Sequence, residues 1–80
     1  MSRNVPSFVY DLVKKGGRVS VWLFENTRTR MEGRLVAFDP YMNLTLVNCD
    51  EVEIKSGKRK HLGEILLKGD NVTAIQDLKE

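Results

Sequence analysis

The sequence predicts a mainly β domain in which one short N-terminal helix precedes a strongly bent, five-stranded antiparallel small barrel. Two observations predict this fold. Near the start of the chain apolar residues recur every three to four positions, and from residue 18 onward they alternate with polar residues in short runs. Turn segments rich in Asp, Asn, Gly and Pro separate these runs, as is typical of small all-β barrels. Because the chain has 80 residues, we expect a single domain, residues 1–80, with a small core.

The first element is a predicted helix over about residues 5–15. The apolar residues that would line one of its faces are Val5, Phe8, Val9, Leu12 and Val13. Pro6 and Ser7 suit the first turn of a helix, and Gly16 with Gly17 suits its end. The pattern therefore predicts a short amphipathic helix that caps the barrel.

Strands are predicted over about residues 18–24, 29–38, 44–53, 61–67 and 72–77. In the first strand Val19, Val21 and Leu23 are expected to face the core, with Ser20 on the opposite face. Gly33 stands in the middle of the second strand, where it permits a sharp bend or the close approach of another segment. Such a bend allows a short sheet to curl into a barrel.

Two polar turns, residues 38–44 and 67–71, carry the most informative side chains. If the turns meet, Tyr41 offers a flat stacking face, Asn43 offers a donor and an acceptor, and Lys68 offers a cation on an apolar stem. These are the components of a pocket for one unstacked nucleic-acid base. A fixed Asn43 would suit uracil and reject cytosine, whose edge presents the reverse donor and acceptor.

Each of these side chains also has an ordinary role. Tyr41 is compatible with a turn aromatic that folds over the barrel edge. Asn43 alone is more often a turn residue, and Lys68 alone is more often a solvated surface charge. Only the pairing of the two turns favours a base pocket.

Four further residues are predicted to support the turns: Asp39, Met42, Gly69 and Asp70. Asp39 is expected to hold the first turn and to orient Asn43 by accepting hydrogen bonds. Gly69 is expected to supply either a positive backbone angle or a close approach that a side chain would obstruct. Asp70 and Asn71 are turn-forming residues with less reason to touch a ligand directly.

The segment from Ile54 to Lys60 is predicted to be a charged hairpin loop. The basic residues in and beside it are Lys55, Lys58, Arg59, Lys60 and His61. Because three acidic residues closely precede this cluster, we expect a solvated hairpin tip. The alternative is a second contact with RNA or with a partner protein.

Composition limits the possible classes of function. A formal charge of +2 is too small for unspecific binding of nucleic acid by charge alone. No run approaches the roughly 18 apolar residues of a membrane span, and the first residues lack the apolar stretch of a signal peptide, so we expect an intracellular, soluble protein. No His/Cys cluster resembles a zinc site, and no metal or cofactor is predicted.

An enzyme is not predicted either. Cys49 and His61 lack an oxyanion hole and a third orienting group, and Cys49 lies within a predicted strand. Since one cysteine cannot form an internal disulfide, a domain of this size is expected to gain stability from partner subunits. The fourth and fifth strands are apolar and poorly protected as edges. Head-to-tail pairing of these two edges would close a ring if the rotation permits.

The sequence resembles the Sm and Sm-like protein family over nearly its whole length. The residues that match the family's first motif are Gly33, Asp39, Tyr41, Met42, Asn43 and Leu44. Those that match its second motif are Ile65, Leu66, Leu67, Lys68, Gly69, Asp70 and Asn71. Many members have Arg-Gly in the second motif, whereas Lys68-Gly69 is shared with a eukaryotic spliceosomal member.

The resemblance implies the Sm fold, a small barrel of the SH3-like or OB-like kind, with RNA-binding residues Tyr41, Asn43 and Lys68. It implies a subunit of a seven-membered ring of different Sm proteins, with SmF and SmG as neighbours. Such a ring encircles the uridine-rich Sm site of small nuclear RNA and forms the core of the splicing ribonucleoproteins. The implied localisation is the nucleus, with assembly in the cytoplasm.

Two alternatives remain open at this point. One is an Sm-like ring subunit that acts in messenger RNA decay or as an RNA chaperone, including a ring of identical chains. It would share the base pocket. The other is a small barrel that binds proteins rather than RNA.

Overall fold

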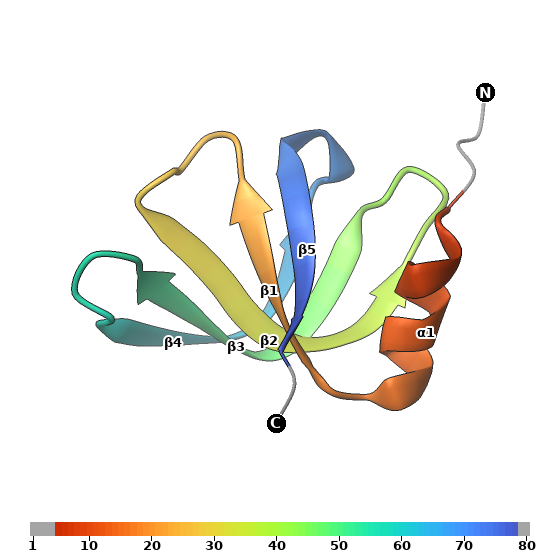
Figure 1. Cartoon of the computed structure of the whole chain (residues 1–80), viewed down its shortest axis with the longest axis horizontal. Helices are drawn as coiled ribbons and strands as arrows, with labels where there is room; N and C mark the ends of the chain where they lie inside the picture. Colours follow the sequence, from red (N-terminus) through yellow and green to blue (C-terminus); the bar gives the residue numbers. More distant parts are fainter. Residues whose placement is uncertain (1–4, 79–80) are drawn as a thin grey trace.

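The computed structural model describes residues 5–78 and shows one helix followed by five antiparallel strands, which confirms the predicted fold class (Figure 1). The elements are α1 (Ser7–Lys15), β1 (Arg18–Leu23), β2 (Thr29–Phe38), β3 (Leu44–Glu53), β4 (Arg59–Leu67), the 3₁₀ turn η1 (Gly69–Asn71) and β5 (Val72–Leu78). The strands form one sheet in the order β4-β3-β2-β1-β5. β4 and β5 are therefore the two edges.

Two predicted ranges differ from the structure by two residues at their start, that of the helix and that of β4. The helix was predicted from about residue 5, but α1 begins at Ser7, because Pro6 has an extended ψ of 142° and disfavours helical backbone at Val5 before it.

Strand β4 begins at Arg59, so Arg59 and Lys60 belong to β4 and the prediction that the hairpin loop extends to Lys60 was wrong. The reason is contact with distant residues, because Arg59 pairs with Val52 of β3 and Lys60 pairs with Glu51. A run of basic residues does not reveal such partners.

Local sequence accounts for the C-terminal end of α1. Gly16 follows the helix with a left-handed φ of 70°, and its N–H donates to the Leu12 carbonyl at 3.2 Å. Val9 and Leu12 are buried, as expected, whereas Phe8 is 48 % exposed. Phe8 lies about 100° around the helix from Val9, which places it at the margin of the buried face.

The core lies inside the curve of the sheet. Its buried residues are Val9, Leu12, Val19, Val21, Leu23, Met31, Leu35, Leu44, Leu46, Cys49 and Leu67. Ser20, on the opposite face of β1 from its apolar neighbours, is also buried at 1 % exposure. The reason is its place in the sheet, where Glu32 of β2 and Gln76 of β5 lie directly across from it.

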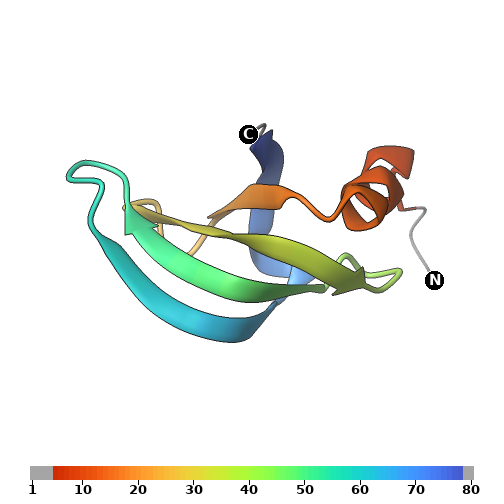
Figure 2. The same cartoon turned by 90° about the horizontal axis from the view of Figure 1, so that it is seen from below.

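β2, β3 and β4 curve together, as Figure 2 shows. At Gly33 the backbone of β3 approaches so closely that a Cβ atom would lie 3.0 Å from the Val47 carbonyl oxygen. The register between the strands shifts at the same place, between Glu32 and Arg34. Gly33 thus permits a close approach at an irregular point of the ladder, one of the two roles expected for it.

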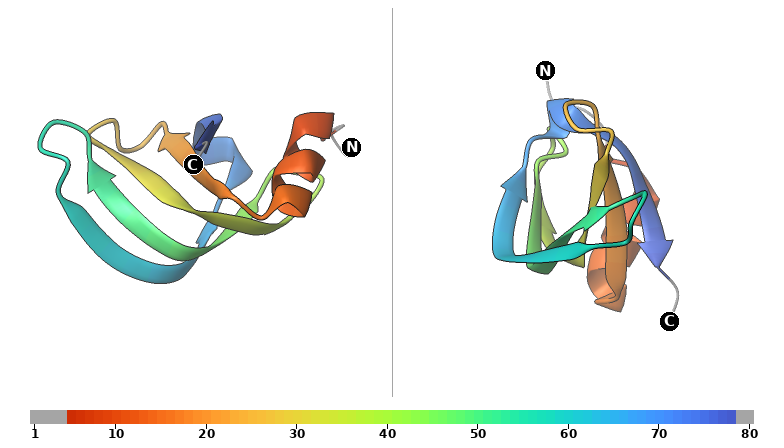
Figure 3. Two further views of the ribbon diagram at one scale, coloured as in Figure 1. Left: turned by 60° about the horizontal axis from the view of Figure 1, so that its bottom comes forward. Right: turned by 90° about the vertical axis from the view of Figure 1, so that its left-hand side faces the viewer.

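Three connections gather on one side of the molecule: the β1–β2 loop, the β2–β3 turn and the segment around η1 (Figures 1 and 3). Hydrogen bonds join the end of β1 to η1. The Phe24 N–H donates to the Asn71 carbonyl at 2.8 Å, and the Glu25 N–H donates to Asn71 Oδ1 at 2.9 Å. The hairpin between β3 and β4 projects away at the end of the molecule opposite α1 (Figure 3).

Candidate nucleic-acid interface

The two turns singled out in the sequence meet in the structure. The Gly69 N–H donates a hydrogen bond of 2.8 Å to Asn43 Oδ1. A Cβ atom on Gly69 would overlap the Tyr41 carbonyl and lie 2.9 Å from the Met42 carbonyl carbon. Gly69 is not among the glycines with a positive φ. Of the two roles expected for Gly69, the structure therefore shows the close approach.

Asp39 holds the first turn through three hydrogen bonds. Its Oδ1 accepts the N–H groups of Tyr41 and Asn43 at 2.9 and 3.0 Å. Its Oδ2 accepts a hydrogen from Asn43 Nδ2 at 2.7 Å. Burial raises the pKa of Asp39, but the hydrogen bonds from Asn43 and Tyr41 outweigh it and hold that pKa below its usual value.

Met42 completes this turn in an unusual backbone conformation. Its φ is 64°, in the left-handed region that few side chains adopt. The Met42 N–H donates to the Asp39 carbonyl at 3.0 Å, and the side chain packs against the core. The turn is thus held by backbone and side-chain bonds together.

Two contacts decide which way the Asn43 amide points. The Gly69 N–H requires an acceptor, so it faces Oδ1, and the Asp39 carboxylate requires a donor, so it faces Nδ2. Each contact uses one lone pair or one hydrogen. On Asn43, one lone pair of Oδ1 and one N–H of Nδ2 remain. They match the edge of a base that presents an acceptor beside a donor, such as O4 and N3–H of uracil.

An open hollow of about 570 Å³ lies over the two turns. Its lining residues are Phe24, Glu25, Tyr41, Asn43, Lys68, Asp70 and Asn71. The structure therefore brings Tyr41, Asn43 and Lys68 to one surface. The Tyr41 side chain is exposed at this surface.

Phe24 and Glu25 line this hollow, but the sequence analysis did not assign them to it. Phe24 was expected to end the first strand. Instead, β1 ends at Leu23 after a register shift against β5, and Phe24 is 66 % exposed. The alternation of β1, which turns Leu23 inward, was the available signal that the next aromatic faces out.

The hollow is not strongly cationic. Lys68 is the cation among its lining residues, whereas Glu25 and Asp70 contribute carboxylates. Asp39, whose lowered pKa keeps it ionised at neutral pH, is hydrogen-bonded to Asn43. Such a surface suits an uncharged base better than a phosphate group.

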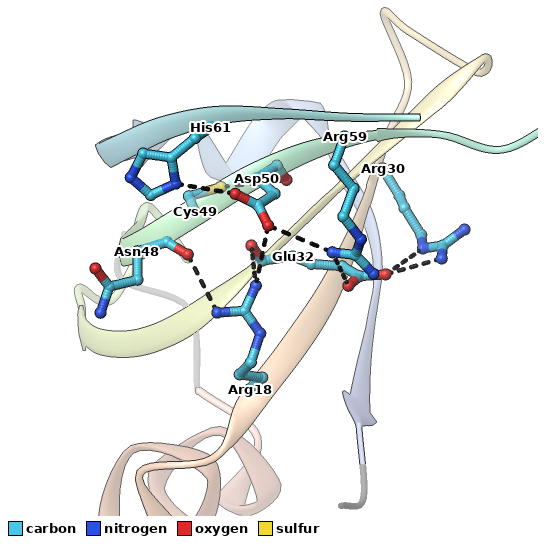
Figure 4. Close-up of polar contacts among 8 residues, drawn as sticks. All are labelled: Arg18, Arg30, Glu32, Asn48, Cys49, Asp50, Arg59 and His61. Atoms are coloured by element: carbon cyan, nitrogen blue, oxygen red, sulfur yellow. Dashed lines mark hydrogen bonds and ion pairs between the residues drawn. The ribbon is translucent and has the colours of Figure 1, made fainter. Parts of the chain in front are cut away.

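A separate network of charged residues ties four strands together (Figure 4). Glu32, only 4 % exposed, forms ion pairs with Arg30 at 2.8 Å and Arg59 at 2.9 Å. Burial raises the pKa of Glu32, but these two arginines hold it below its usual value. Arg59 is therefore part of the fold, not of a solvated hairpin tip.

Asp50 forms the second half of this network. Its carboxylate contacts Arg18, Arg59 and His61. The hydrogen bond with His61 Nδ1, at 3.0 Å, is the main cause that lowers the pKa of Asp50.

Cys49 is fully buried, and burial raises its pKa to about 11, so its thiol is protonated at neutral pH. His61 is hydrogen-bonded to Asp50, and the Cys49 thiol donates to the Asp50 carbonyl, so Cys49 and His61 are not arranged as a nucleophile with its base.

Residues 5–78 contain no group of three His, Cys, Asp or Glu side chains arranged to hold a metal ion. Within the same range, no helix has the length and apolar character needed to cross a membrane.

Residues 11–77 match the LSM domain family. The chain therefore belongs to the LSM-domain family. This assignment confirms the resemblance to Sm and Sm-like proteins. A heptameric archaeal Sm protein of known structure shares the fold of this LSM domain, with a TM-score of 0.78 and 27 % identity over 92 % of this chain and 100 % of that one.

Two relatives narrow the position of this LSM domain within the family. A probable small nuclear ribonucleoprotein E of Drosophila melanogaster is 46 % identical over 72 residues, or 90 % of this chain and 77 % of that protein. The small nuclear ribonucleoprotein E of Schizosaccharomyces pombe is 46 % identical over 70 residues, or 88 % of this chain and 82 % of that protein. The chain is thus similar to proteins named small nuclear ribonucleoprotein E over most of its length.

Proposed function

We propose that this LSM-domain protein is a subunit of a spliceosomal Sm ring that encircles the uridine-rich Sm site of small nuclear RNA. The ring forms the ribonucleoprotein core for splicing of pre-messenger RNA, so the role is binding and assembly without catalysis. The similarity to small nuclear ribonucleoprotein E supports this assignment. The observation that carries the RNA-binding role is the Asn43 amide held between Asp39 and Gly69.

In the proposed mechanism each pocket side chain makes one kind of contact with a uracil base. Tyr41 stacks on the base, a contact worth about 1–3 kcal/mol in proteins that bind single strands. Lys68 covers the other side with its aliphatic stem and directs its ammonium group outward. The remaining lone pair and N–H of Asn43 bind the uracil edge.

The proposed ring is built by strand pairing. β4 and β5 lie at opposite edges of the sheet, and Leu62 and Leu66 of β4 are exposed large apolar residues. Pairing of β4 in one subunit with β5 in the next is a head-to-tail contact, which can close into a ring. We propose other Sm proteins as the partners, with SmF and SmG as neighbours, and the nucleus as the site of action after assembly in the cytoplasm.

The first test isolates the tagged chain from its own cells under gentle conditions and determines the mass, protein content and RNA content of the complex. A ring of different Sm chains with small nuclear RNA is expected. A ring of identical chains, or one that carries messenger RNA fragments, would transfer the function to the Sm-like alternative. A complex without RNA would contradict the proposal.

A second test concerns the pocket itself. In a ring with one copy of this chain, Asn43 reads a single position of the Sm site. Replacing uridine by cytidine at that position should weaken binding to the wild-type ring by about 1–3 kcal/mol, the usual discrimination of a good bidentate contact. In the Asn43→Ala ring this loss should disappear, whereas the Asn48→Gly ring should keep it, because Asn48 lies on β3 with a positive φ that glycine tolerates. Unchanged discrimination in the Asn43→Ala ring would refute the pocket.

A further inference from the structure

We propose that the tip formed by the β1–β2 loop and the β3–β4 hairpin binds the phosphate backbone of RNA that extends beyond the base pocket. This inference rests on the proposed function and adds a second RNA contact to it. The two connections are joined where the Ile54 N–H donates to the Arg28 carbonyl at 2.9 Å. They enclose a second hollow of about 510 Å³, lined by Thr27, Arg28, Glu53, Ile54 and Lys55.

The tip carries cations that the fold does not use. Its exposed basic side chains without an ion pair to any residue in the range 5–78 are those of Arg28, Lys55, Lys58 and Lys60. Arg59, in contrast, is engaged by Glu32 and Asp50. The carboxylates of Glu51 and Glu53 lie nearby and balance the basic side chains only in part. Strong binding of single-stranded RNA requires such cations along the backbone.

The base pocket itself does not supply these cations. Glu25 and Asp70 line it beside Lys68, so a phosphate group placed there would meet negative charge. The charge of a bound strand must be neutralised outside the pocket. The distribution of charge therefore assigns the base to one hollow and the backbone to another.

The β1–β2 loop connects the two hollows. Glu25 lines the first hollow and Arg28 lines the second. Three residues of extended chain span at most about 11 Å, so the two surfaces are close. A strand that leaves the pocket along this loop reaches the basic tip without crossing the rest of the barrel.

The test uses the ring assembled with its native partner chains and two RNA probes. One probe is a uridine-rich RNA with one nucleotide for each subunit, and the other adds single-stranded extensions at both ends. In the Lys55→Gln/Lys58→Gln ring, binding of the extended probe should depend less steeply on salt. The slope of log affinity against log salt should become shallower by about 0.7 for each lost phosphate contact. Affinity for the short probe should not change.

The matched control is the Lys14→Gln/Arg34→Gln ring, which removes two exposed cations of α1 and β2 that also have no ion pair within residues 5–78. It should behave like the wild type. An unchanged salt slope with the extended probe would overturn the inference and restore the solvated tip. Loss of a protein from the complex with an unchanged slope would also overturn it and assign the tip to protein binding.

Failure of this inference can be told from failure of the proposed function. The pocket is judged by discrimination between uridine and cytidine on the short probe, which the tip does not contact. The tip is judged by how much steeper the salt dependence of affinity is for the extended probe than for the short one. A ring that binds neither probe would overturn both proposals.

Discussion

In the proposed pocket, one side-chain amide, that of Asn43, would select the base. A freely rotating amide would present its oxygen and nitrogen interchangeably, and it could not distinguish uracil from cytosine. The Asp39 carboxylate and the Gly69 N–H remove this freedom, because each accepts only one orientation. The proposed selectivity therefore depends on three residues from two turns.

Replacing Asp39 by Asn tests this dependence. The variant retains an oxygen for the N–H groups of Tyr41 and Asn43, but it turns an amide donor toward the donor Nδ2 of Asn43. We expect the ring to assemble normally and its preference for uridine over cytidine to fall several-fold. Competition binding with RNAs that differ at this one position measures the effect, and a preference equal to that of the wild type would show that Asp39 does not orient Asn43.

The same carboxyl predicts a pH dependence. Hydrogen bonds keep the pKa of Asp39 in the folded protein below its usual value, about 3.9 when unfolded. The stabilisation of the fold by these hydrogen bonds is therefore complete above about pH 4. It is lost as the pH falls through the pKa of Asp39 in the folded protein. Affinity for uridine-rich RNA should be constant from pH 7 to about pH 5 and should fall in stronger acid. The Asp39→Asn ring should lack the part of this fall that is due to the turn.

At the scale of elements, the β2–β3 turn and η1 are held together by backbone contact at Gly69. A Cβ atom at this position would overlap the Tyr41 carbonyl, and backbone atoms cannot move aside as a flexible side chain can. Gly69→Ala should therefore destabilise the fold by about 1–3 kcal/mol or more, in the range of overpacked sites. It should also separate Asn43 from its donor and weaken RNA binding.

Gly17→Ala is the matched control for Gly69→Ala, because a Cβ atom on Gly17 meets nothing within 4 Å and its φ is not positive. This substitution should be neutral or slightly stabilising. Thermal unfolding of the two variant complexes beside the wild type compares them. Equal melting temperatures for all three would mean that the turns can separate without cost.

Apolar runs separated by polar turns predicted β2 and β3 at their observed limits. This pattern failed where distant partners decide the structure. The start of β4 has no apolar alternation, and its strand conformation depends on pairing with β3 and on the ion pairs of Arg59. The alternation of β1 indicates that Phe24 faces outward, but it does not show that η1 lies beside it, where the Phe24 N–H donates to the Asn71 carbonyl.

At the scale of the whole molecule, the candidate site illustrates what a sequence motif can predict. Tyr41, Asn43 and Lys68 were predicted as a group only on the condition that their turns meet. The structure meets this condition through a contact between residues 26 positions apart in the chain. One pocket of this kind binds a single base weakly, and a ring that repeats it raises affinity through effective concentration. Assembly is therefore a requirement of the proposed function.

The dependence on assembly leads to a prediction at the edge of the sheet. Leu66 of β4 is 62 % exposed in the single chain, and the proposed pairing with β5 of a neighbour would cover it. Leu66→Glu should leave the barrel folded, because the residue faces solvent there. It should weaken the ring contact by at least about 1.5–3 kcal/mol, the value of burying one leucine, because the ring must also bury a charge.

Native mass measurement of the chain coexpressed with its partners tests this prediction. Val36→Glu is the control, because Val36 is also partly exposed but lies on β2, which has hydrogen-bonded neighbours on both sides. Leu66→Glu should release subunits or smaller complexes at concentrations where Val36→Glu remains in the ring. If both variants assemble like the wild type, the β4 edge is not the contact between subunits. If only Leu66→Glu gives smaller complexes, and these bind RNA more weakly, RNA affinity depends on assembly of the ring.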